Sequence, residues 1–241
     1  AIIPLSSRSS EAYACACAHT RHGAPMFMVT HSWSNLFLHL VSAVVAHAIG
    51  LDDYERVAKM LESRNILETL RNQDAVLLQK TYWICAFCVN QHAGICGGFG
   101  PEPKVGTETY MQWDRGRRDT VTGQIYPICH CSCPKFFNDQ PDDCEMNKFD
   151  DMMRYIHAHG NCQQVIAMDR VGDIFTRAWC IAELACADSL GMPQVMMVFR
   201  AADIEFEAVD VSNPVFRKMV NLRVENCEAS RPEDKDDILA K

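Results

Sequence analysis

The chain lacks any apolar run long enough to cross a membrane. A spanning helix needs about 20 consecutive apolar residues. The best candidate, residues 36–51, is shorter than this and contains His39 and His47. We therefore expect no membrane span, and the helical spacing of the apolar residues in this segment predicts a buried amphipathic helix.

Positive charge is also scarce. The sequence has 23 lysines and arginines against 31 aspartates and glutamates, a formal net charge of −8 at pH 7. Because affinity for duplex nucleic acid depends on lysine and arginine contacts to phosphates, we expect no nucleic-acid partner. The densest basic run, residues 115–118, is short and predicts a solvated loop.

Glycine patterns that bind phosphate are missing as well. Residues 94–100 are rich in glycine, but they have neither the dinucleotide-binding spacing nor the Lys-Ser/Thr pair of a P-loop. We interpret this segment as a flexible lid.

Cysteine, in contrast, is abundant, with thirteen residues in the chain. The number is odd, and Cys85, Cys88, Cys180 and Cys186 lie in apolar runs that predict buried structure. Buried free cysteine behaves as a small hydrophobic residue, and disulfide frameworks are typical of smaller secreted chains. This favours free thiols in a reducing, cytoplasmic compartment, with disulfides as the alternative.

Apolar runs alternate with helical patterns along most of the chain. Alternation of this kind predicts an α/β fold, here a doubly wound, mostly parallel sheet of five strands. The N-terminal residues 1–24 predict an irregular segment, and residues 25–241 an α/β domain with a cysteine-rich insertion at about 94–147 that carries a short strand at 124–129. The five strands are expected at residues 25–31, 81–87, 163–168, 194–199 and 222–227, and helices at 35–49, 52–64, 66–78, 148–159, 177–187, 213–220 and 232–241.

Three segments carry a family resemblance. Residues 27–33 (FMVTHSW) are similar to the first strand and following loop of TIR domains, and residues 177–187 (RAWCIAELACA) to their Trp-Cys-x-x-Glu-Leu helix. Residues 83–91 (WICAFCVNQ) are similar to the HET pattern Trp, Ile, Asp, two residues, Cys, Ile, Asn, Gln, although Cys85 stands where that pattern has Asp. The chain thus resembles the TIR-like superfamily, including its HET (heterokaryon-incompatibility) branch.

The resemblance implies a flavodoxin-like fold and two kinds of function. Some members of the superfamily cleave the nicotinamide–ribose bond of NAD+ with the carboxylate that matches Glu183, and others are adaptors that self-associate. It therefore implies either NAD+ as a substrate or a self-associating scaffold without enzymatic activity.

The residues around Glu183 fit a ligand site. Trp179 and Glu183 are four residues apart and share one helix face. A carboxylate on this face can stabilise a cationic ribose. The alternatives are that Trp179 packs in the core and that Glu183 forms an ion pair with Arg177. Ser32 and Trp33 follow the first strand and Asn90 the second, at the edge where parallel sheets bind ligands. We expect Ser32, Trp33, Asn90 and Trp179 to border an open cleft that contains Glu183, although a helix cap and solvated loops also explain them.

The insertion offers soft metal ligands. Cys129, Cys131, Cys133 and Cys144 could hold structural zinc in tetrahedral geometry, or form disulfides, or remain free thiols. A second set consists of Cys15, Cys17, His19 and His22. A zinc-bound hydrolase is therefore a third candidate function.

Overall fold

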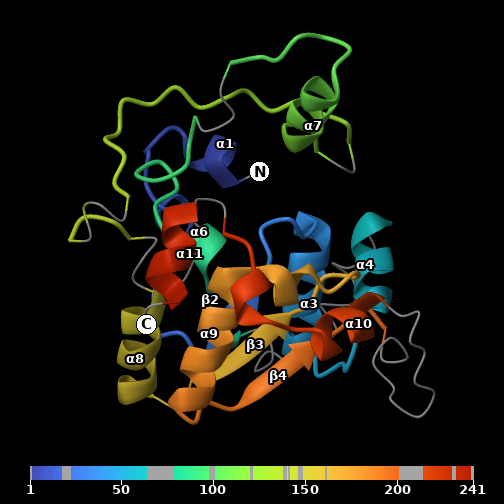
Figure 1. Cartoon of the computed structure of the whole chain (residues 1–241), viewed down its shortest axis with the longest axis vertical. Coiled ribbons are helices and arrows are strands. Elements are labelled where there is room, and N and C mark those ends of the chain that lie inside the picture. Colours follow the sequence, from blue (N-terminus) through green and yellow to red (C-terminus); the bar gives the residue numbers. More distant parts are fainter. Residues whose placement is uncertain are drawn as a thin grey trace. The chain divides into compact units, whose positions relative to one another are not determined.

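The structure is a computed structural model of the whole chain, which divides into two compact units (Figure 1). Unit 1 comprises residues 1–22 and 84–148, and unit 2 comprises residues 23–83 and 149–241. The residues described are 2–17, 23–63, 79–97, 101–119, 122–137, 140, 142–145, 149–160, 162–200, 214–229 and 232–239.

Unit 2 is built on a four-stranded sheet of order β2-β1-β3-β4. β1 and β3 pair in parallel with Val29 opposite Val165, and β3 and β4 pair in parallel with Val165 opposite Val195. This confirms the predicted α/β architecture with parallel strands. The strands are β1 (Phe27–His31), β2 (Tyr82–Ile84), β3 (Gln163–Ala167) and β4 (Gln194–Met197).

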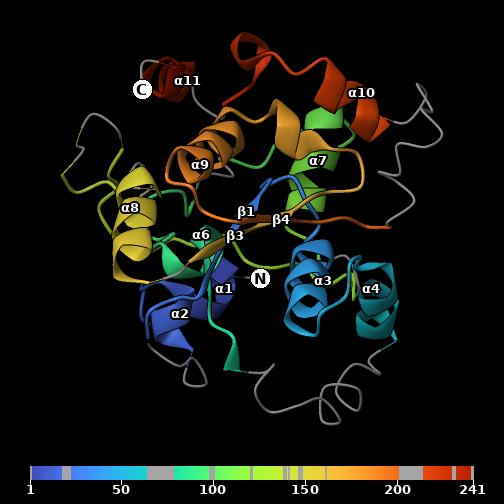
Figure 2. The same ribbon diagram turned by 90° about the horizontal axis from the view of Figure 1, so that it is seen from below.

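Helices cover both faces of this sheet. α3 (Phe37–Ala48) and α4 (Glu55–Glu62) lie on one face, and α8 (Phe149–His159) and α9 (Ala178–Ser189) lie on the other (Figure 2). Successive strand residues point to opposite faces, so β1 supplies apolar side chains to both layers. α3 follows β1 and α9 follows β3 along the chain, on opposite faces, which is the doubly wound arrangement.

α9 packs against two groups of buried apolar side chains. Cys180 and Ile181 join Ile166 of β3 in one group, and Ala187 joins Met28 of β1 in the other. α10 (Pro214–Val220) and α11 (Pro232–Leu239) contribute to the first group through Val215 and Ile238. A helix with apolar contacts on several sides is held firmly, and this fixes the side chains that α9 presents to the sheet.

The turn between β3 and α9 is held by one buried carboxylate. Asp169 Oδ1 accepts hydrogen bonds from the backbone N–H groups of Val171 (3.1 Å) and Asp173 (2.9 Å), and Oδ2 accepts one from Ile174 (2.9 Å). Gly172 has φ +71°, and a Cβ at this position would lie 3.2 Å from the Cα of Val215. The turn leads into a short 3₁₀ helix, η2 (Asp173–Thr176), and so sets where α9 begins.

Unit 1 contains short helices and long irregular segments. The helices are α1 (Ile2–Ser6), α2 (Tyr13–Ala16), α6 (Cys85–Cys88) and α7 (Glu108–Gly116). Residues 1–24, predicted to be irregular, contain the short helices α1 and α2, whereas the predicted bounds of the insertion at about 94–147 stay a prediction. The predicted strand at 124–129 is wrong, because residues 122–137 form only a single bridge, between Ile125 and Arg118.

Two predicted strands require correction. The second strand ends at Ile84, and the apolar run continues as helix α6; periodicity cannot separate a buried strand from a buried helix over so short a run. Residues 222–227 contain a 3₁₀ helix, η4 (Val224–Asn226), instead of a fifth strand, and Leu222 and Val224 are exposed. The apolar side chains of this segment alternate with polar ones, but residues 222–226 are exposed and do not pair with the sheet. The predicted helix at 66–78 lies outside the described residues.

No helix in the described part of the chain is both long and apolar enough to span a membrane. The longest described helices of unit 2, α3 and α9, have 12 residues each.

Candidate functional site

The side chain of Glu183 points from α9 onto the sheet. Its carboxylate oxygen Oε2 accepts a 2.5 Å hydrogen bond from the hydroxyl of Thr30, a fully buried residue of β1. Glu183 as a residue keeps partial solvent exposure, whereas its carboxyl group is enclosed by protein atoms. The carboxylate of Glu183 is thus hydrogen-bonded to β1, and it neither pairs with Arg177 nor faces solvent.

Two glutamine side chains extend this contact across the sheet. Gln164 Nε2 donates to Thr30 Oγ1 (2.8 Å) and to the backbone oxygen of Glu183 (3.3 Å). Gln194 Nε2 donates to Gln164 Oε1 (2.7 Å). The donors therefore run in one direction, from β4 through β3 and β1, and end on the Glu183 carboxylate. A chain of hydrogen bonds oriented in this way strengthens its last member.

Glu183 lies where the direction of winding reverses. The chain passes from β1 to β2 on one side and then returns to β3 on the other side of β1, so β1 and β3 form the switch point of the sheet. Open α/β sheets bind ligands at the carboxyl ends of the strands at this point. Thr30 is the fourth of the five residues of β1, and Cys180 Sγ of α9 donates to the carbonyl of the last, His31 (3.4 Å).

Burial raises the pKa of the Glu183 carboxyl to about 7, and the hydrogen bond from Thr30 opposes this rise. Desolvation disfavours the charged form of a carboxyl group, whereas a donor favours it. The group consequently changes charge near neutral pH, which is the range in which a carboxyl group is most useful in proton transfer.

The loop after β1 carries the predicted residues Ser32 and Trp33. Ser32 is buried, and its Oγ lies 2.7 Å from Oγ of Ser34, while the indole of Trp33 is 47% exposed. Asn35 Nδ2 and His31 Nδ1 are buried atoms with no hydrogen-bond partner. Burial lowers the pKa of His31 to about 4, so its imidazole is neutral at pH 7.

Trp179 has a packing role. Its ring meets that of Phe149 edge to face, with 5.4 Å between the centroids, and it packs against both apolar groups of unit 2. This matches the core interpretation of the residue; its contact with a ligand stays a prediction.

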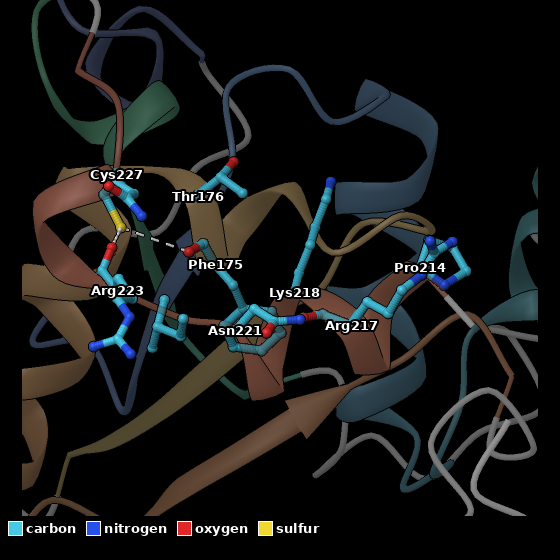
Figure 3. A pocket seen from close by; sticks show the side chains of 10 residues that line it. Phe175, Thr176, Pro214, Arg217, Lys218, Asn221, Arg223 and Cys227 are labelled. Carbon is cyan, nitrogen blue, oxygen red and sulfur yellow. Dashed lines mark hydrogen bonds between the residues drawn. The ribbon is translucent and has the colours of Figure 1, made fainter. Parts of the chain in front are cut away.

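A cavity of about 370 Å³ lies in another part of unit 2 (Figure 3). It is lined by residues of η2, α10 and the segment before η4, including the basic side chains Arg217, Lys218 and Arg223. Lys218 is paired with Asp173. None of the predicted site residues lines this cavity, so the open cleft expected beside Glu183 stays a prediction.

Asn90 belongs to unit 1, where all its polar groups have partners. Its backbone N–H donates to Glu145 Oε2 (2.9 Å), its Nδ2 donates to the carbonyl of Ser10 (3.2 Å), and its Oδ1 accepts from the backbone N–H of His92 (3.0 Å). These bonds fix the loop that carries His92. The prediction that Asn90 borders the same cleft as Glu183 stays untested.

A second candidate site in unit 1 is formed by this loop together with residues 129–131. His92, Cys96, Cys129 and Cys131 place one ligand atom each within 4.8 Å of one another. The Sγ atoms of Cys96 and Cys131 are 3.2 Å apart, and His92 Nδ1 lies 3.4 Å from Cys129 Sγ and 3.7 Å from Cys131 Sγ. We call these four residues the His/Cys cluster; its donor set can bind a metal ion such as zinc.

Two of the four predicted metal ligands belong to the His/Cys cluster. Cys129 and Cys131 do, whereas the buried Cys144 and the half-buried Cys133 do not, and their places are taken by Cys96 and His92. The spacings His-x₃-Cys and Cys-x-Cys were visible in the sequence, but nothing in it indicated that the two pairs meet. In the alternative set of Cys15, Cys17, His19 and His22, both histidines lie outside the described residues.

The thiols of the His/Cys cluster differ in acidity. Burial opposes ionisation of Cys131, but hydrogen bonds from the Cys133 backbone and the Cys96 side chain outweigh it and lower the pKa to about 5. Burial raises the pKa of Cys96 to about 11. Cys131 therefore holds the thiolate of the pair, and Cys96 donates a hydrogen bond to it.

No protein-family model, curated protein or solved structure matches this chain. The resemblance to the TIR-like superfamily accordingly rests on the three sequence segments and stays a prediction.

Proposed function

We propose that unit 2 is a TIR/HET-like unit that cleaves the nicotinamide–ribose bond of NAD+, with Glu183 as the catalytic carboxylate. The observation that carries the proposal is the hydrogen bond between Thr30 and Glu183 at the switch point of the sheet. It combines a fixed carboxylate with the position at which an α/β sheet binds its ligand.

The strand order supports a flavodoxin-like unit. Flavodoxin-like sheets have the order 2-1-3-4-5, and the order β2-β1-β3-β4 agrees with it over four strands. Their ligands bind at the switch point between the first and third strands, where Thr30 and Gln164 contact Glu183.

The chemistry requires a fixed negative charge. As the bond from ribose C1 to the nicotinamide nitrogen breaks, nicotinamide leaves as a neutral base and positive charge develops on the ribose. An ionised Glu183 stabilises this charge in a largely dehydrated site. Water then adds to C1 and loses a proton, so the products are nicotinamide, ADP-ribose and one proton. A carboxyl group with a pKa of about 7 is ionised in a large fraction of molecules at neutral pH.

The loop after β1 supplies contacts for the rest of the dinucleotide. The backbone N–H groups at the start of α3, a helix of 12 residues, suit a phosphate group. The unpartnered amide Nδ2 of Asn35 is a further donor, and the half-exposed indole of Trp33 offers a face on which a ring can stack. These groups lie next to β1, the strand that holds Glu183 through Thr30.

The test is nicotinamide release from NAD+ by the full chain and by Glu183→Gln. This substitution keeps the shape of the side chain and removes its charge, and we expect turnover to fall about 100-fold or more. Asp188→Asn is the matched control, because Asp188 is an exposed carboxylate on the same helix. Its turnover should stay within about twofold of the wild type. Equal turnover of wild type and Glu183→Gln would refute the role of Glu183.

A non-enzymatic, self-associating scaffold is the second candidate. It is favoured by the exposure of two large apolar residues in one loop, Trp33 (47%) and Leu36 (44%), since exposed apolar patches mark interaction sites. A wild type that assembles with increasing concentration but releases no nicotinamide, even when assembled, would favour this function. Trp33→Ala should then weaken assembly in light-scattering measurements, whereas Val220→Ser, which changes an exposed residue of α10, should not.

A further inference from the structure

We propose that the His/Cys cluster is a structural zinc site that holds unit 1 together, with His92, Cys96, Cys129 and Cys131 as its four ligands. This inference is independent of the function proposed for unit 2. It assigns a ligand set that differs at two positions from the one expected from the cysteine spacing of residues 129–144.

The spacing of the ligand atoms matches one tetrahedral ion. Zinc–sulfur bonds of about 2.3 Å imply sulfur–sulfur separations of about 3.8 Å and slightly shorter sulfur–nitrogen separations. The separations of 3.2 Å for Cys96–Cys131, 3.4 Å for Cys129–His92 and 3.7 Å for Cys131–His92 fall near these values. All four ligand atoms lie within 4.8 Å of one another, close enough to surround a single ion.

The hydrogen bonds of Ser6 select the imidazole tautomer that zinc needs. The Ser6 hydroxyl donates to the carbonyl of Ile2 (3.0 Å), so its oxygen accepts from Nε2 of His92 at 2.9 Å. Nε2 therefore carries the proton, and the lone pair of Nδ1 faces the sulfur atoms. A metal-binding histidine typically donates its other ring N–H to such a partner.

Lys135 balances the charge of the proposed site. Zinc with three thiolates and a neutral imidazole has a net charge of −1. The Lys135 ammonium lies 3.0 Å from Cys96 Sγ and 3.7 Å from Cys131 Sγ, and it also donates to the carbonyls of His92 and Cys133. It thus supplies a positive charge and N–H···S hydrogen bonds to the ligands.

The backbone is shaped to bring the two ligand pairs together. Gly97 follows Cys96 with φ +79°, and a Cβ there would lie 3.3 Å from the carbonyl oxygen of Cys129. Phe136 N–H donates to the carbonyl of Ala93 (2.9 Å), which joins the two segments a second time. A glycine is therefore required at the point where the two segments approach each other.

The fold of unit 1 gives the ion a structural role. Residues 122–137 form no helix or strand, so few backbone hydrogen bonds hold Cys129 and Cys131 beside Cys96, which is 35 residues before Cys131. Segments with so little regular structure are commonly ordered by disulfides or metals. Four protein ligands fill a tetrahedral zinc site, which is the pattern of structural rather than catalytic sites. On binding, each cysteine that is still a thiol releases its proton to solvent.

The experiment measures zinc in the full chain, purified under reducing conditions without added metal. We expect one zinc per chain by elemental analysis, and cobalt that replaces it should give the visible spectrum of tetrahedral thiolate coordination. His92→Ala and Cys96→Ser should lose the metal. Because these variants could also fail to fold, the wild type is treated with a chelator in parallel, and residues 122–137 should then become sensitive to protease.

Two other variants define the ligand set. Cys133→Ser should keep one zinc per chain, because Cys133 lies outside the His/Cys cluster, and so should Cys15→Ser, which removes an exposed thiol of unit 1. Loss of zinc from Cys133→Ser would overturn the assigned set.

The proposal as a whole fails if the wild type contains and binds no zinc. A disulfide between Cys96 and Cys131 in the reduced preparation, detected by mass spectrometry of peptides, would overturn it equally, because it would consume two of the proposed ligands.

Discussion

The hydroxyl of Thr30 and the carboxylate of Glu183, 153 residues apart in sequence, form a 2.5 Å hydrogen bond. This contact joins the central strand of unit 2 to the helix that packs on it. Thr30 in turn accepts from Gln164. An acidic side chain on the sheet face of a helix is costly to bury unless it is hydrogen-bonded. Here residues of three strands form the hydrogen-bond network that ends on Glu183.

Stability of unit 2 should depend on the ionisation of Glu183. Between pH 4.5 and about 7 the unfolded chain ionises this group while the folded chain keeps it protonated, so stability falls as the pH rises and levels off above 7. The loss amounts to up to about 3 kcal/mol. Glu183→Gln should remove this pH dependence and should be more stable than the wild type at pH 8. Urea unfolding of both proteins at pH 5 and pH 8 measures this difference. A wild type and variant with parallel pH dependence would show that the carboxyl is not buried.

The two glutamines of the network should differ in importance. Gln164 is fully buried and bonded on both sides, whereas Gln194 is exposed on β4. Gln164→Leu leaves Thr30 without its donor and should cost about 1–3 kcal/mol. Gln194→Leu, the control, should cost less than about 1 kcal/mol, because water can replace its exposed amide. Urea midpoints measure both, and equal costs would mean that the network does not act as described.

Ser6 should tune zinc affinity without contacting the ion. Ser6→Ala removes the acceptor of the His92 Nε2 proton and should weaken zinc binding about 10–100-fold in competition with a chelator. Ser7→Ala serves as the control, because Ser7 is an exposed neighbour that bonds only to the carbonyl of Pro4 among the described residues. Unchanged affinity in Ser6→Ala would argue against Nδ1 as the ligand atom.

Lys135 should act through its charge. Lys135→Met removes the positive charge beside the sulfur atoms and should lower zinc affinity, whereas Lys135→Arg should retain most of it. The same competition assay at low and high salt separates charge from packing, because added salt screens charge interactions. If both variants bind zinc as the wild type does, the ammonium is not part of the site.

Much of unit 2 was predictable from the sequence, because its strands are short, largely apolar runs and its helices have apolar residues at regular spacing. β1, β3 and β4 were predicted to within two residues at either end. The prediction failed where the local pattern did not decide the structure. Residues 85–88 are apolar and fit either a strand or a helix, and residues 222–226 alternate in polarity but are exposed.

The sites were predictable only in part. The sequence singled out Glu183, but Thr30 and Gln164, which hold it, look like ordinary strand residues. Cys129 and Cys131 were expected to bind metal. His92 and Cys96 lie beside them because the folded chain brings two distant segments together, and the spacing of residues within either segment does not predict this.

The most direct test of the proposed function is the pH profile of nicotinamide release. Wild-type turnover should rise with pH through about 7 as Glu183 ionises. Thr30→Val removes the hydrogen bond that lowers the pKa of Glu183, so its profile should rise at a higher pH. Glu183→Gln should have no such rise and little turnover. A wild-type profile that is flat across pH 5 to 8 would contradict the account. So would a Thr30→Val profile that rises at the same pH as the wild-type profile.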